Sequence, residues 1–122
     1  MMRHFLALGL VSLALAAPAH ASDAAACKAM KAALAPREAE ISDLKAKRDA
    51  SAELTETAGE AWDEVEVHRL MSSGHAAQAD SGKAAYEEAR RQLARDEMAL
   101  QATLKQYNAD VAVFNARCTS KK

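Results

Sequence analysis

The chain has 122 residues and a formal net charge of −1, and half of its residues are hydrophobic. Alanine accounts for 31 residues, so few large apolar side chains remain to build a core. With only four glycines and two prolines, the composition excludes a β-sandwich or a parallel α/β sheet and predicts an elongated all-α protein. Charges of both signs are interspersed, which excludes a basic surface for nucleic acid or for an anionic membrane.

Residues 1–21 have the three parts of a secretory signal peptide. Arg3 and His4 form a short basic start, and residues 5–17 are an uninterrupted run of apolar and small side chains. Pro18 then precedes Ala19-His20-Ala21, which has the small-x-small pattern of a cleavage site. The run of 13 residues is too short to span a bilayer. We therefore expect cleavage after Ala21, export to the periplasm or beyond it in a bacterial host, and a mature chain without stable membrane insertion.

Residues 22–122 are predicted to form a single helical domain, and its first part has the repeat of a coiled coil. Seam positions alternate at intervals of three and four residues. They are Cys27, Met30, Leu34, Arg37, Ile41, Leu44, Arg48 and Ser51. Helix-forming residues predict a first helix over about residues 24–71. Pro36 and the capping-box pattern around Gly59 mark two points where this helix can be interrupted.

The second part of the domain continues the same repeat after a turn. Ser72-Ser73-Gly74 is the clearest turn signal, and Asp80-Ser81-Gly82 marks a candidate second break at residues 80–82. The seam then runs through Tyr86, Arg90, Leu93, Glu97, Leu100, Leu104, Tyr107, Val111, Phe114 and Cys118. This pattern predicts a second helix over about residues 83–117, and therefore an antiparallel, coiled-coil-like hairpin of two helices.

The two cysteines predict how the hairpin is closed. Residues that face each other in an antiparallel hairpin have a nearly constant sum of residue numbers. Cys27 with Cys118 gives 145, whereas Trp62 with Tyr86 gives 148, and both sums centre the turn on residues 72–74. The sequence leaves this half-turn choice open. Because an exported chain enters an oxidising compartment, we expect an intramolecular Cys27–Cys118 disulfide, with pairing between chains as the alternative.

An apolar cluster near the predicted turn is a candidate surface for contact with a partner. It comprises Trp62, Val65, Val67, Leu70 and Met71. The facing stretch, residues 75–86, offers mainly alanine and one tyrosine, so part of the cluster is expected to stay exposed. The alternative is that Trp62 packs on Tyr86 and that the cluster is mostly covered.

Candidates for chemistry are few. His68, Met71 and His75 are the best metal ligands, but seven residues separate the histidines by about 10 Å on a continuous helix. Only a turn would bring them closer, and no cysteine or carboxylate completes a ligand motif. The sequence has no Gly-rich phosphate loop, no nucleophile elbow and no HExxH motif, so we expect neither a cofactor nor catalysis.

These features together predict a non-enzymatic envelope protein that acts by protein–protein contact, as a scaffold, a chaperone-like protein or an inhibitor-like protein. Two alternatives stay open. One is a small periplasmic metal-binding or metal-sensing protein that uses the three candidate ligands. The other is a structural spacer that self-associates through its thin seam.

Overall fold

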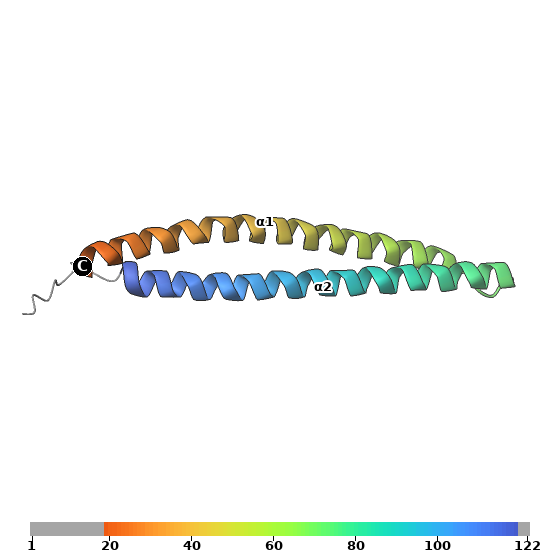
Figure 1. The fold of residues 1–122 in the computed structure, drawn as a ribbon. Coiled ribbons are helices and arrows are strands. Elements are labelled where there is room, and N and C mark those ends of the chain that lie inside the picture. The colour runs from red at the N-terminus through yellow and green to blue at the C-terminus, as the bar shows by residue number, and fades with distance from the viewer. Residues whose placement is uncertain (1–18, 120–122) are drawn as a thin grey trace, which may run out of the picture.

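The computed structural model describes residues 19–119, with side chains described from Asp23 onward. It consists of two long helices, α1 (Ala19–Glu66) and α2 (Ser73–Cys118), which pack against each other as an antiparallel hairpin (Figure 1). The predicted all-α hairpin is therefore confirmed. Residues 1–18 of the predicted signal peptide lie outside the described residues. Within the described part, neither helix has an apolar stretch long enough to cross a bilayer.

The connection between the helices lies earlier than the sequence predicted. α1 ends at Glu66, and two hydrogen bonds of the i→i+3 type then tighten the chain, from His68 N to Val65 O (3.2 Å) and from Arg69 N to Glu66 O (3.1 Å). Ser72 is the N-cap of α2, with extended backbone and a side chain that accepts from His75 N. The prediction of a turn at residues 72–74 was wrong because Ser72 caps a helix instead of turning the chain.

The proposed helix breaks are absent, because the residues read as breakers have other roles. Gly82 lies inside α2 against Trp62, where an added Cβ would stand 3.2 Å from the Trp62 Cα. Gly59 lies inside α1 against the Tyr86 ring, 3.3 Å from an added Cβ. Both glycines therefore allow the helices to approach closely. Pro36 also lies within α1, on the exposed side, where water can reach the carbonyl that loses its partner.

The seam between the helices is thin and partly polar. Only Ala79 and Leu100 are buried apolar residues among those described, while most seam positions are half-buried. Two buried polar residues, Ser51 and Asp96, meet in the middle of the seam. Asp96 takes the place that the repeat assigned to Glu97, which is exposed. Both residues lie close to the seam between Leu93 and Leu100, but it is Asp96 that accepts a hydrogen bond from α1, from the Ser51 hydroxyl.

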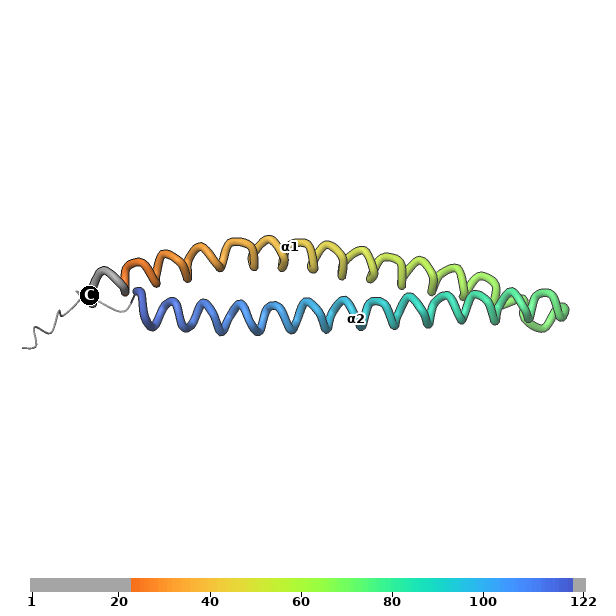
Figure 2. Tube along the Cα trace, viewed as in Figure 1, coloured from red at the N-terminus to blue at the C-terminus, as the bar shows by residue number. Residues whose placement is uncertain are grey.

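A disulfide closes the end of the hairpin opposite the turn. Cys27 and Cys118 are bonded, with their Cα atoms 5.7 Å apart. From there the two helices run side by side to the turn (Figure 2). The bonded cysteines have the lower predicted sum, 145, and the neighbouring, tilted rings of Trp62 and Tyr86 near the turn have the higher one, 148. The two registers that the sequence could not separate therefore describe opposite ends of one hairpin.

Candidate functional site

The tip of the hairpin, residues 66–75, exposes three apolar side chains. Leu70 is 98% exposed, Val67 76% and Met71 69%. All three lie in the connection between α1 and α2, at the convex end of the molecule. Exposed leucines and valines together at one protruding point are typical of a surface that a partner covers.

The other two residues of the predicted contact cluster lie elsewhere. Trp62 is half-buried, with its ring centre 5.5 Å from that of Tyr86. Val65 is half-buried as well, and its Cγ2 atom lies against Gly82. These two side chains belong to the seam. The exposed part of the cluster, called here the apolar tip, is therefore Val67, Leu70 and Met71.

A polar network that the sequence reading missed holds the tip in shape. The Arg69 guanidinium donates from Nε and Nη2 to the two carboxylate oxygens of Glu66, at 2.8 and 2.9 Å. Its Nη1 donates to Asp80 on α2 at 2.7 Å, so Arg69 ties the end of α1 to the second helix. Glu66 also accepts from Trp62 Nε1 at 3.0 Å. The i,i+3 spacing of Glu66 and Arg69 in the sequence could have indicated their ion pair. The bond from Arg69 to Asp80 could not be predicted, because it depends on the path of the turn.

This network also sets the electrostatics of the tip. The hydrogen bonds from Arg69 and then from Trp62 favour the ionised carboxylate, and they lower the pKa of Glu66 below its ordinary value. The same hydrogen bonds to Glu66 and Asp80 raise the pKa of Arg69. One cation faces two carboxylates, so the cluster of Glu66, Arg69 and Asp80 carries a net charge of about −1 at neutral pH. The charge of Lys83 on α2 also contributes to the lowering of the pKa of Glu66.

The turn brings the two candidate histidines together. The ring centres of His68 and His75 are 6.1 Å apart, and the rings meet edge to face. His75 Nδ1 lies 2.7 Å from Ser72 Oγ. Met71 donates its backbone N–H to His68 O at 2.9 Å, which places it one tight turn after His68. The chain thus gathers the three candidate ligands at the tip, although its helix bounds differ from the predicted ones.

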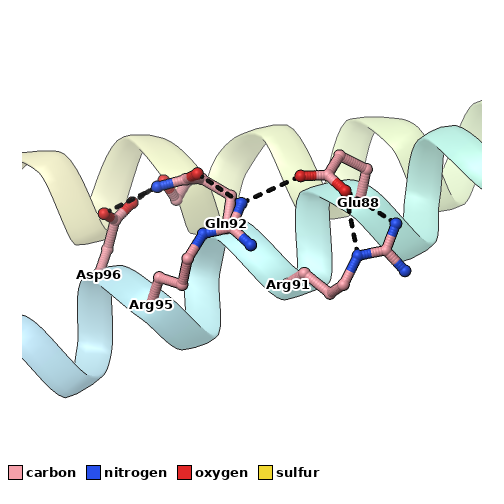
Figure 3. Close-up of polar contacts among 6 residues, drawn as sticks. Glu88, Arg91, Gln92, Arg95 and Asp96 are labelled. Carbon is pink, nitrogen blue, oxygen red and sulfur yellow. Dashed lines mark hydrogen bonds and ion pairs between the residues drawn. The ribbon is translucent and has the colours of Figure 1, made fainter.

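A second polar cluster follows α2 into the middle of the seam (Figure 3). Glu88 accepts from Arg91 and from Arg95, and Arg95 also donates to Gln92. Gln92 donates to Asp96 at 3.0 Å, and Asp96 accepts from Ser51 on α1 at 2.5 Å. The bonds from Ser51 and then Gln92 lower the pKa of Asp96. The bond from Ser51 ties this cluster to α1, so it favours the register in which Ser51 and Asp96 face each other.

Sites of other kinds are not evident in residues 23–119. No three His, Cys, Asp or Glu side chains of this stretch form a group that could hold a metal ion. A shallow hollow near the disulfide, of about 270 Å³, is lined by Met30, Ala33, Leu34, Asp110 and Val113. Its carboxylate, Asp110, accepts from Gln106 at 2.9 Å. Comparison of the chain with protein-family models, with curated proteins and with solved structures gave no match.

Proposed function

We propose that the chain is an exported, non-enzymatic envelope protein that works by contact, and that the apolar tip is the surface that meets its protein partner. The observation that carries the proposal is the exposure of Val67, Leu70 and Met71 together at one end of a braced hairpin. Export is supported by the signal-like residues 1–21 and by the disulfide, because disulfides form and persist in oxidising compartments.

The geometry of the tip favours a particular kind of partner. A narrow convex end fits a concave surface, and its three apolar side chains fit an apolar pocket. The Arg69 network keeps the backbone of the turn in place before binding, which lowers the entropy cost of association. Because Arg69 is already paired with two carboxylates, an anionic lipid surface is a poorer match than a protein pocket.

The proposal is tested by site-specific photocrosslinking in cells. A photoreactive amino acid replaces Leu70 in one strain and Leu54 in another. Leu54 is a matched control because it is also an exposed leucine, 64% accessible, but lies within α1, twelve residues before the helix ends at Glu66. We expect an adduct with another envelope protein from position 70 and none from position 54.

Two results would contradict this assignment. An adduct whose mass equals two copies of the chain would favour the self-associating spacer. Equal crosslinking from positions 70 and 54 would show that the tip has no special role. A Leu70→Asp variant gives a second readout, since a charge placed in an apolar pocket is expected to abolish capture of the same partner.

A further inference from the structure

The geometry of the turn points to a metal site at the tip, in which His68, His75 and Met71 bind one copper(I) ion. This inference is independent of the proposed function, although Met71 belongs to both surfaces. It rests on the distance between two imidazole rings, on the conformation of the turn and on the chemistry of the donors.

The first step is the distance between the rings. Metal–nitrogen bonds are about 2.0–2.1 Å long, so the ring centres of two imidazoles bound to one ion lie roughly 5–6 Å apart. The ring centres of His68 and His75 are 6.1 Å apart, just above this range. On a continuous helix the same two residues would be separated by about 10 Å. The turn between α1 and α2 is what brings the imidazoles within reach of a shared ion.

The second step is the orientation of His75. Its Nδ1 atom lies 2.7 Å from Ser72 Oγ, which leaves Nε2 as the nitrogen for a metal. When Nε2 binds a metal, Nδ1 carries the proton and donates it to the hydroxyl oxygen. A serine oxygen can accept this bond together with the one from His75 N. Metal-binding histidines commonly have such a partner on the second ring nitrogen, which holds the ring in place.

The third step is the choice of Met71 as the remaining donor. Residues three apart are eclipsed in a chain with i→i+3 hydrogen bonds, and the bond from Met71 N to His68 O has this form. Met71 and His68 therefore project from the same side of the turn. The Met71 side chain is 69% exposed, so its thioether is accessible to an incoming ion.

The donor set then selects the metal. Thioether sulfur is a soft ligand that favours copper(I), whereas zinc in structural sites takes four ligands, mainly Cys and His. No group of three His, Cys, Asp or Glu side chains is present in the described residues, so a zinc site of that type is not available at the tip.

The test is an anaerobic titration of the purified full chain with copper(I) alone, in competition with a chromophoric chelator. We expect one copper(I) per chain. His68→Ala and His75→Ala are each expected to weaken binding at least tenfold, and Met71→Leu to weaken it by a similar factor. The matched control is Met98→Leu, which changes a methionine that is 72% exposed on α2 and should bind as the unaltered chain does.

Several results would overturn the site. They are the absence of binding, undiminished binding in the double His68→Ala, His75→Ala variant, and an affinity in Met98→Leu that falls as far as in Met71→Leu. Retained copper(I) affinity in Met71→Leu, with loss in the histidine variants, would overturn the three-ligand assignment. Helicity measured by circular dichroism should stay the same in every variant, because the changed side chains lie outside the seam or at its exposed end.

Discussion

Ser51 and Asp96 are 45 residues apart in the sequence, yet the Ser51 hydroxyl donates to the Asp96 carboxylate at 2.5 Å in the middle of the seam. Both side chains are buried, and Gln92 and Lys47 supply the further partners of the carboxylate. A buried carboxylate without donors would be destabilising. The pair is therefore a register constraint as well as a contact, because a slip of one helix along the other would remove the donor that Asp96 has in Ser51 and leave it only the bond from Gln92 on its own helix.

Replacing Ser51 by alanine should lower the free energy of unfolding by roughly 1–3 kcal/mol, because a buried acceptor loses its donor. Urea unfolding followed by circular dichroism measures this change. Thr55→Val is a useful control, since the Thr55 hydroxyl donates only to the Ser51 carbonyl within α1. A Ser51→Ala variant as stable as the original chain would show that the register does not depend on this bond.

The same carboxylate predicts a pH dependence of stability. The pKa of Asp96 in the folded chain is below its ordinary value of 3.8, so the ionised form stabilises the fold. This contribution is present at neutral pH and is lost as the pH falls below 3.8 through the lowered pKa. Asp96→Asn does not titrate. We therefore expect the difference in urea midpoint between the original chain and Asp96→Asn to shrink between pH 7 and pH 3; a constant difference would contradict the assignment.

Arg69 is expected to control the ionisation of Glu66 at the tip. In Arg69→Ala, the pKa of Glu66 should rise toward its ordinary value of 4.5. It should stay somewhat below that value, because the hydrogen bond from Trp62 still favours the ionised carboxylate. An NMR titration of the Glu66 carboxyl carbon measures this change. Arg91→Ala is the matched control, because it should raise the pKa of Glu88 and leave Glu66 unaffected. Amide exchange in residues 66–72 should also become faster in Arg69→Ala alone.

Replacement by alanine is expected to change the stability of the hairpin differently at each of three glycines. At Gly74 an added Cβ meets only Ser72 Oγ, at an ordinary 3.6 Å, so Gly74→Ala should gain up to about 1 kcal/mol of helix propensity. At Gly82 the new Cβ would press on the backbone of Trp62 at 3.2 Å, and the helices would have to separate. Gly82→Ala should therefore destabilise the hairpin. Gly59→Ala should lie between them, because the Tyr86 ring is a side chain that can shift. A thermal-unfolding series in which Gly82→Ala is the most stable variant would refute this order.

Removal of the disulfide should have the largest effect on stability. The bond spans 91 residues, and the chain-entropy model gives about 4–5 kcal/mol for a loop of this length. Because Ala79 and Leu100 are the only buried apolar residues in the described part, little else offsets the loss. The Cys27→Ser, Cys118→Ser double variant should unfold at much lower urea, and its helices should exchange amides fastest near residues 27 and 118. Unfolding at an unchanged urea concentration would show that the seam alone holds the hairpin.

The repeat and the cysteines were sufficient to predict the fold. The spacing from Cys27 to Ser51 and from Tyr86 to Cys118 predicted two helices, and the structure has both, with the predicted pairing of the two cysteines at one end. Composition patterns did not locate the turn. Serine and glycine are common to turns and to helix N-caps, and only the tertiary path shows that Ser72 caps α2.

The candidate site was predictable in its residues but not in its arrangement. All three members of the apolar tip were in the predicted cluster, and both histidines were singled out. Trp62 and Val65 are not part of the exposed surface, because they pack against Gly82 and Tyr86 on α2. That packing depends on the register of the two helices, which the sequence left open. Arg69 was missed since its partner Asp80 is eleven residues away and becomes a neighbour only once the chain has turned.

The disulfide end of the hairpin has an engineering consequence. The segment from Cys27 to Cys118 begins and ends at two Cα atoms only 5.7 Å apart, while α1 carries the tip about 60 Å away from them. A segment with adjacent entry and exit points can be spliced into a surface loop of another protein without stretching its host. Residues 27–118 are therefore suited to transplantation as a covalently locked arm, which would display a chosen sequence at residues 67–71 far from the carrier.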